Sequence, residues 1–288
     1  MLKQRVITAL VLLAILLPAL FYPSPWPFAG VILVLMAAGA WEWGRLNGLG
    51  MAASLGLGGV CVLLCGASLA LGWAQPVVLT PLWVVGGAAW VLVAVLLLRV
   101  GVPGWPRIAL AVRIVSGVLA LWLAWLAAVQ ARALGVNFLL SVLALVWVAD
   151  IAAYFAGRAF GLRFTKGKLA PAISPGKSWE GVWGGMAGVV LLALVWVTLD
   201  ASSNAQGPSF YTLLVQHGGW LLLVPVVLGM AAMSVCGDLI ESLIKRSAGA
   251  KDSSRLLPGH GGVLDRVDAL LPTLPLAMMV ASLVAAAT

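Results

Sequence analysis

The sequence predicts an all-α, polytopic transmembrane helix bundle of about nine spans with a cytoplasmic N-terminus. The chain of 288 residues is 63% hydrophobic and only 9% charged, and its mean hydropathy is +1.10. Its apolar runs are about twenty residues long, the length that a helix needs to cross a hydrocarbon core of about 30 Å. The basic residues lie in the short loops between these runs, as is typical of cytoplasmic loops.

The candidate spans follow one another along the whole chain. They cover residues 6–22, 28–44, 53–73, 77–98, 111–131, 137–157, 181–199, 219–240 and 269–287. The first span follows Lys3 and Arg5 and resembles a secretory signal, but Pro18 and the proline-rich turn at 22–27 favour a retained span. Cys61, Cys65 and Cys236 lie inside apolar runs without His or acid partners, so we interpret them as core residues.

Loop charge gives the orientation of the bundle. With the N-terminus in the cytoplasm, Arg132 is the only one of the 17 Lys and Arg that falls on the outer side. The net charge of +8 would also suit a nucleic acid, but basic residues confined to short loops argue against that partner. We expect an integral protein of the bacterial inner (plasma) membrane, surrounded by lipid, with its active site on the cytoplasmic side.

Polar residues are concentrated in the second half of the chain. Residues 1–136 hold few of them, and we expect this half to pack the bundle or to form a dimer face. Residues 137–288 are expected to form the catalytic region, with two long cytoplasmic segments at 158–180 and 241–268 and a polar outer loop at 200–218. A transporter is disfavoured because its polar features would recur in both halves as matched, broken helices.

The window 242–268 holds most of the unusual chemistry. Its charged residues are Lys245, Arg246, Lys251, Asp252, Arg255, Asp265, Arg266 and Asp268. Cations, spaced acids and a glycine turn are what a metal-assisted phosphate reaction requires. The turn, His260-Gly261-Gly262, permits positive φ and a close backbone approach to an anion. His260 is open to three roles: a phosphate donor or a support for a metal ligand, both of which we favour, or a proton carrier.

Asp238 lies near the end of an apolar span, where a buried carboxylate indicates a functional site. Glu241, Ser242 and Lys245 follow at i+3, i+4 and i+7, so all four share one helical face. A Glu241–Lys245 salt bridge at a helix end is the alternative for Glu241. Asp265 and Asp268 are also spaced i, i+3, and could simply favour a helix N-terminus. The functional interpretation is that these acids, on two helices, bind Mg²⁺. One or two carboxylates hold this ion together with substrate phosphates.

The other long segment adds Asp150, Tyr154 and Arg158, followed by a Ser-Pro-Gly-Lys-Ser-Trp-Glu-Gly run. This run contains Ser174, Lys177, Ser178 and Glu180. It could bind phosphate through hydroxyls, backbone N–H groups and a lysine, and it also resembles a helix start capped by Ser178. Asp150 could instead pair with Arg158, which would snorkel towards the interface.

These motifs resemble those of the phosphatidate cytidylyltransferases (CDP-diacylglycerol synthases). The family pattern matches in one register from Ser242 to Asp268. Gly237-Asp238-x-x-Glu241-Ser242, the stretch from Asp150 to Arg158 and the run from Ser174 to Gly181 also look like family motifs; Ser178 stands where Thr is more usual. The likeness covers the whole chain, with its specificity in 150–268.

The resemblance implies a homodimeric membrane enzyme that converts CTP and phosphatidate into CDP-diacylglycerol and pyrophosphate, with Mg²⁺ and a second cation as candidate cofactors. Asp238 and Asp265 would hold the metal, with Asp268 assisting. The residues expected in catalysis are Asp238, Lys245, Arg246, Lys251, His260, Asp265 and Asp268. Those expected in substrate binding are Asp150, Tyr154, Arg158, Ser174, Lys177, Ser178, Glu180, Glu241, Ser242, Asp252, Gly261, Gly262 and Arg266. A CTP-dependent lipid kinase is the closest rival activity.

Overall fold

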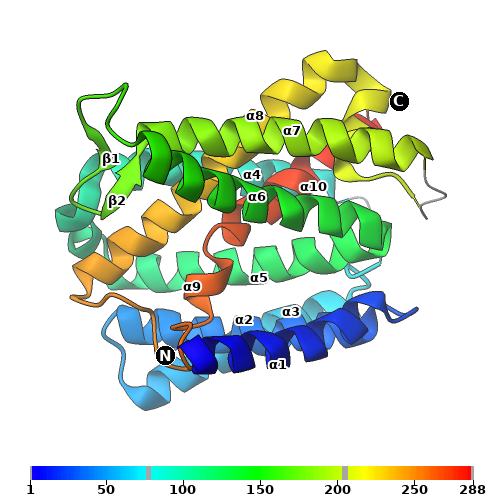
Figure 1. The fold of residues 1–288 in the computed structure, drawn as a ribbon. Helices are drawn as coiled ribbons and strands as arrows, with labels where there is room; N and C mark the ends of the chain where they lie inside the picture. Colours follow the sequence, from blue (N-terminus) through cyan, green and yellow to red (C-terminus); the bar gives the residue numbers. More distant parts are fainter. Residues whose placement is uncertain (1, 76–78, 203–206, 287–288) are drawn as a thin grey trace.

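The computed structural model describes residues 2–75, 79–202 and 207–286 (Figure 1). Within these ranges, 9 helices are long and apolar enough to cross a membrane, which confirms the predicted polytopic bundle. The long helices are α1 Leu2–Phe21, α2 Trp26–Leu46, α3 Met51–Ala70, α4 Thr80–Gly104, α5 Leu110–Leu134, α6 Val136–Phe160, α7 Trp179–Ser202, α8 Phe210–Ser247 and α10 Leu270–Ala286. Positions 77, 78 and 287, at the ends of two predicted spans, lie outside the described residues.

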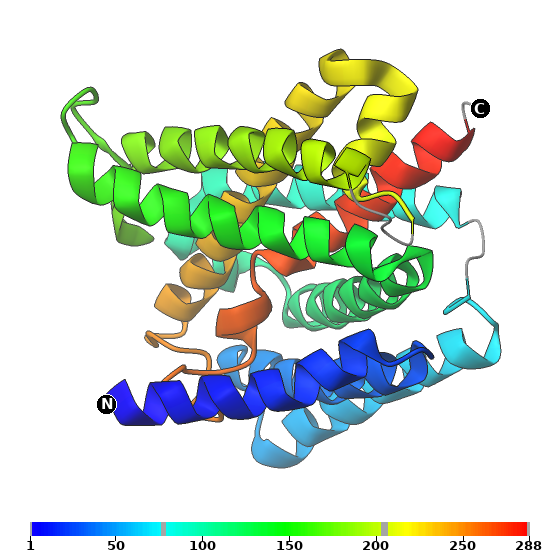
Figure 2. The ribbon, with the colours of Figure 1, turned by 45° about the vertical axis from the view of Figure 1, so that its right-hand side comes forward.

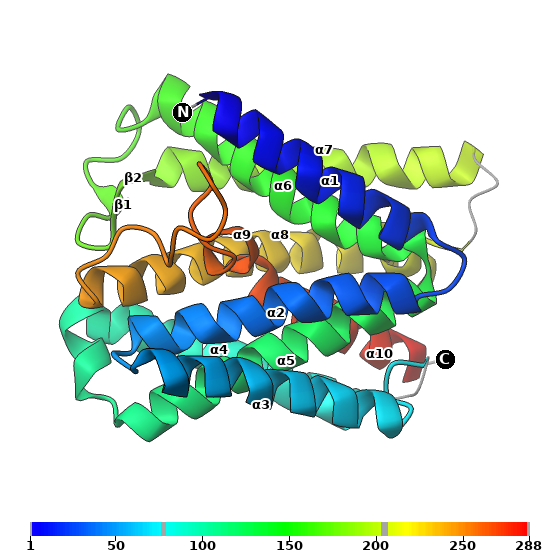
Figure 3. The same cartoon turned by 90° about the horizontal axis from the view of Figure 1, so that it is seen from below.

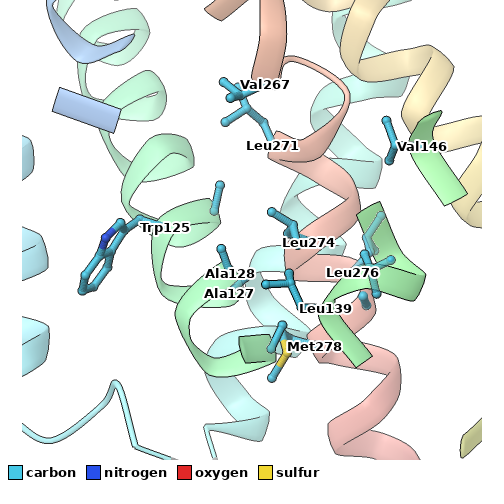
Figure 4. Close-up of a cluster of buried hydrophobic side chains, with 14 of the residues drawn as sticks. Trp125, Ala127, Ala128, Leu139, Val146, Val267, Leu271, Leu274, Leu276 and Met278 are labelled. Atoms are coloured by element: carbon cyan, nitrogen blue, oxygen red, sulfur yellow. The ribbon is translucent and has the colours of Figure 1, made fainter. Parts of the chain in front are cut away.

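The long helices run roughly along one axis and pack around α5 and α10 (Figures 1 and 2). The helices α1 to α3 lie on one side of α5, and α6 and α7 lie on the other. Figure 4 shows the core between them, where Trp125 of α5, Leu139 of α6 and Leu274 of α10 are at most 2% exposed. Outward-facing apolar side chains such as Leu92 and Leu191 remain exposed, as expected for a surface that meets lipid.

The prediction of a polar outer loop at 200–218 is wrong for most of these residues. The helix α7 continues to Ser202 and α8 already begins at Phe210, so only a short connection lies between them. Ser209 caps α8 by accepting a hydrogen bond from the Thr212 backbone N–H at 3.2 Å, and Phe210 is fully buried. The helix then breaks at Gly219, whose φ of 62° is readily available to glycine.

The two long inner segments are shorter than predicted and are not wholly irregular. The helices α6 and α8 extend to Phe160 and Ser247, which leaves connections at 161–178 and 248–263. The first contains a small antiparallel hairpin of β1 (Lys168–Ala170) and β2 (Ser174–Ser178), an exception to the predicted all-α fold. The second leads into the short helix α9 (Leu264–Val267), and a 3₁₀ turn, Trp105–Arg107, follows α4.

Arg132, the one basic residue predicted on the outer side, has a structural role. Its Nε and Nη2 atoms donate hydrogen bonds of 2.7 Å to the carbonyl oxygens of Leu20 and Tyr22, at the C-terminal end of α1. The last carbonyls of a helix have no partner within the helix and attract positive charge. The guanidinium group therefore joins the end of α1 to α5.

Candidate active site

The predicted site residues lie towards one end of the bundle, the end that also holds the N-terminus and the hairpin (Figures 1 and 3). The C-terminal ends of α6 and α8 meet the N-terminal ends of α7 and α9 there. Within it, six charged side chains make up what we call the carboxylate–lysine cluster: Lys177, Asp238, Glu241, Lys245, Asp265 and Asp268.

The α8 residues share one helical face, as predicted. The Ser242 hydroxyl donates to Asp238 Oδ1 at 3.2 Å, and Lys245 forms an ion pair with Glu241 one turn before it. The alternative interpretation of Glu241 is therefore also correct. Asp238 finds its cation on another element, because Lys177 Nζ of β2 lies 2.6 Å from Asp238 Oδ2.

Lys245 also joins α8 to α9. Its Nζ atom lies 2.5 Å from Asp265 Oδ1, so one ammonium group pairs with carboxylates from two segments. The other oxygen of Asp265, Oδ2, accepts from the Ser253 N–H at 2.9 Å and the Gly262 N–H at 2.7 Å, and it lies 3.0 Å from the Ser253 hydroxyl, whose single proton can go to Asp265 or to Glu42. Asp265 is thereby fixed to the 248–263 loop.

Asp268 lies against α8. It is partly buried, its Oδ1 accepts from the Ala269 N–H at 2.8 Å, and it is close enough to Asp238 and Asp150 for their charges to interact. Gly237 makes this approach possible, because a Cβ atom there would lie 2.5 Å from the Asp268 carbonyl oxygen. The predicted acids of the two segments are therefore brought together.

The glycine turn has the positive φ expected of it. Gly261 has a φ of +84°, and its carbonyl accepts from the Leu257 N–H at 2.8 Å. A Cβ atom on Gly262 would overlap Ser253 and Glu42, so only glycine fits. The Gly262 N–H approaches an anion of the protein itself, Asp265. The Nδ1 atom of His260 is buried without a hydrogen-bond partner, and the role of this residue stays a prediction.

Glu42 of α2 is a member of the site that the sequence analysis did not single out. Its carboxylate accepts four hydrogen bonds from the 248–263 loop and the start of α9, and it is fully buried. One signal was available. Glu42 is an acid near the end of an apolar span, and such a residue indicates function.

The hairpin segment is held by two of the predicted residues. The Ser178 hydroxyl accepts from the Gly181 N–H at 3.2 Å and caps α7, as expected. Glu180 Oε1 accepts from the N–H groups of Phe164 and Thr165 and from the Thr165 hydroxyl, at 2.8–3.1 Å. Glu180 Oε2 is buried without a hydrogen-bond partner.

The remaining predicted residues form no ion pair with the cluster in the described part of the chain. Arg158 donates to the Tyr154 hydroxyl at 3.1 Å. This contact takes the place of the Asp150–Arg158 ion pair that was the alternative interpretation of Asp150. Those that are exposed to solvent or lipid in the described structure are Asp150, Tyr154, Arg158, Arg246, Lys251, Asp252 and Arg266, and Ser174 is partly buried. An open pocket of about 490 Å³ lies beside the cluster and is lined by Trp41, Arg45, Lys251, Asp252, Ser253, Ser254 and Arg255.

The donors of the cluster fit a divalent metal that the substrate completes. Among the described residues, no group of three or more His, Cys, Asp and Glu is arranged to hold a metal alone. Mg²⁺ needs only one or two carboxylates when substrate phosphates supply further oxygens. Asp238 and Asp268 provide such carboxylates, and Glu241 Oε1 adds a buried acceptor without a hydrogen-bond partner.

Comparison with known proteins gives one consistent result. The model of a family described as "Cytidylyltransferase family" matches residues 3–284. A relative from Pseudomonas aeruginosa named "Phosphatidate cytidylyltransferase" is 41% identical over 288 residues, covering 96% of this chain and 95% of the relative. A protein of the same name from Haemophilus influenzae is 38% identical over 296 residues, covering 96% of each. One from Brucella suis is 46% identical over 137 residues, covering 48% of this chain and 44% of the relative.

Proposed function

The chain belongs to the cytidylyltransferase family, and we propose that it transfers the cytidylyl group of CTP to phosphatidate through the carboxylate–lysine cluster. It is a transferase of phospholipid biosynthesis and an integral membrane protein. The observation that carries the proposal is the convergence of Lys177 and Lys245 on acids from α8 and α9 at one end of the bundle.

The reaction exchanges one phosphoanhydride for another. A phosphate oxygen of phosphatidate attacks the α-phosphorus of CTP in line and forms the new P–O bond. The bond between the α-phosphorus and its bridging oxygen breaks, and pyrophosphate leaves with that electron pair. The lipid phosphate is already an anion, so the attack needs no general base. Catalysis is then mainly positioning and neutralisation of charge.

The chain's own cations suit that task. Lys177 is about a quarter exposed, so its ammonium group is accessible to an anion while Asp238 orients it. Lys245 is more buried and holds Glu241 and Asp265 in place. The exposed cations Arg246, Lys251 and Arg266 surround the cluster, where they can attract two anionic substrates that repel each other.

Asp238, Asp265 and Asp268 are the proposed carboxylates for Mg²⁺, with a second cation as a further candidate. When bound there, a divalent cation would neutralise negative charge on the phosphates of CTP. The structure supports Asp238 and Asp268 more directly than Asp265, because the Lys245 ammonium group and the N–H groups of Ser253 and Gly262 already occupy the oxygens of Asp265. Asp265 also has the task of orienting Lys245.

We further propose that the cluster faces the cytoplasm from the bacterial inner membrane and that the enzyme acts as a homodimer. The first proposal is supported by loop charge, which places the loops of the cluster on the cytoplasmic side. It is also supported by the substrates, because phosphatidate lies in the leaflet and CTP is cytosolic. The second rests on the family resemblance. Cross-linking followed by mass measurement would test the dimer, and labelling of Lys251 in right-side-out and inverted vesicles would test the orientation.

The function is tested by the products of the purified protein. With phosphatidate, CTP and Mg²⁺, we expect pyrophosphate and CDP-diacylglycerol to appear in equal amounts. The matched control is Asp238→Asn, which keeps the size of the side chain and the acceptor for Ser242. Release of CDP with a phosphorylated lipid would identify a kinase instead, and absence of both products from folded protein would refute the proposal.

A further inference from the structure

One carboxylate of the N-terminal half reaches the active-site loop. Glu42 lies four residues before the end of α2, between Trp41 and Trp43, and its side chain is 0% exposed. Burying a charged group is costly unless it is paired or fully hydrogen bonded. No Lys, Arg or His of the described residues forms an ion pair with Glu42, so its hydrogen bonds must offset that cost.

All four donors to Glu42 come from one stretch of chain. Oε1 accepts from the Ser254 hydroxyl at 2.6 Å and from the Val263 N–H at 2.9 Å. Oε2 accepts from the Ser253 hydroxyl at 3.0 Å and from the Leu264 N–H at 2.8 Å. The donors stand on both sides of the glycine turn, so the carboxylate fastens the two limbs of the loop to each other and to α2.

The same limbs hold Asp265. Its Oδ2 atom accepts from the backbone N–H groups of Ser253 and Gly262. The Ser253 hydroxyl lies 3.0 Å from both Asp265 Oδ2 and Glu42 Oε2 and can give its one proton to either. Asp265 in turn lies 2.5 Å from the Lys245 ammonium group. A continuous chain of contacts therefore runs from α2 through the loop to the carboxylate–lysine cluster. The packing around Gly262 is tight, since a Cβ atom there would overlap Glu42 and Ser253.

We propose that Glu42 is a positioning residue for cytidylyl transfer. It touches no substrate, but it fixes the 248–263 loop and α9 so that Asp265 and Lys245 face the reacting phosphates. This inference rests on the proposed function. It also makes the N-terminal half, which we expected only to pack or to dimerise, a working part of the active site.

The sharpest variant is Glu42→Gln. Its single carbonyl oxygen can still accept from one backbone N–H, but the amide NH₂ cannot accept from the other. One buried N–H, of Val263 or Leu264, is then left without a partner. The matched control is Asp200→Asn. Asp200 lies on α7 near the opposite end of the bundle, where it accepts from Asn137, Ser209 and Thr212.

Two readouts separate positioning from a general loss of stability. Steady-state rates should show kcat of Glu42→Gln lowered on the order of 100-fold, because misplacing a catalytic group by about 1 Å has that effect. The KM values for CTP and phosphatidate should change much less. Trypsin should cleave the folded Glu42→Gln variant faster than the wild-type protein after Lys251 and Arg255, which are exposed in the loop. Asp200→Asn should keep the wild-type kcat and the wild-type cleavage rate at these sites.

A folded Glu42→Gln protein with wild-type kcat and wild-type loop cleavage would overturn the proposal, even if its melting temperature fell. If the wild-type protein proved not to transfer cytidylyl groups, the proposed function would fail, while the trypsin experiment would still report whether Glu42 holds the loop. If Glu42→Gln does not fold, Ser254→Ala removes the shortest of the four hydrogen bonds, together with the one that the Ser254 hydroxyl accepts from the Leu256 N–H. Unchanged kcat and cleavage in that variant would then refute the inference.

Discussion

Lys245 offers the most informative perturbation of the site. The Lys245→Met variant keeps the length of the apolar stem but removes the ammonium group. Glu241 and Asp265 are then left without the cation that they share. Two nearby carboxylates without a cation repel each other, so we expect the variant to lose both stability and activity.

The size of the effect follows from burial. The side chains of Lys245, Glu241 and Asp265 are 12%, 7% and 5% exposed, so this is a buried ionic triad and the small values for surface pairs do not apply. Removing one partner of a buried pair lowers the free energy of unfolding by about 3–5 kcal/mol. For a protein of this size, that corresponds to a fall in melting temperature of roughly 6–20 °C.

Thermal unfolding in detergent measures this effect. The matched control is Lys168→Met, because Lys168 is exposed and its Nζ donates to the Pro175 carbonyl and forms no ion pair with the described residues. Adding Glu241→Gln to Lys245→Met should restore part of the lost melting temperature by removing one unpaired carboxylate. A shift no larger than that of Lys168→Met, or no recovery in the double variant, would refute the reasoning.

Two further predictions concern close contacts. Gly237→Ala places a Cβ atom 2.5 Å from the Asp268 carbonyl oxygen, so it should separate the two acid-bearing segments and lower kcat on the order of 100-fold. Gly229→Ala on the same helix meets nothing within 4 Å and should be active; equal rates in both variants would contradict the role of Gly237. Arg132→Ala removes the donors to the end of α1 and should lower the free energy of unfolding by about 1–3 kcal/mol without changing kcat, which thermal unfolding and rate assays would check together. An unchanged melting temperature would show that Arg132 does not secure α1.

Much of the fold and the α8 side of the site could be predicted from the sequence. Apolar runs determine the spans because lipid requires them, and a helix repeats its face every three to four residues. These two rules gave the bundle and the shared face of Asp238, Glu241, Ser242 and Lys245. The helical stretch that starts at Phe210 was missed because the break at Gly219 leaves it too short to form a span by itself.

Contacts between distant segments were beyond sequence reasoning. Lys177 and Asp238 are 61 positions apart in the numbering, and Glu42 bonds to residues more than 200 positions away. No local pattern specifies such pairs, since they depend on how helices pack. Glu42 did carry a warning sign as an acid flanked by two tryptophans in an apolar helix, but that sign does not name its partners.

The central claim is that acids of α8 and of the segment before α10 hold a divalent cation at which nucleotide and lipid meet. Its most direct test is anomalous diffraction from crystals grown with Mn²⁺ and a CTP analogue that cannot be cleaved. We predict a manganese peak coordinated by Asp238 and at least one of Asp265 and Asp268, in contact with the nucleotide phosphates and lost in Asp238→Asn. A nucleotide-bound peak away from these carboxylates, or one that persists in Asp238→Asn, would contradict the account.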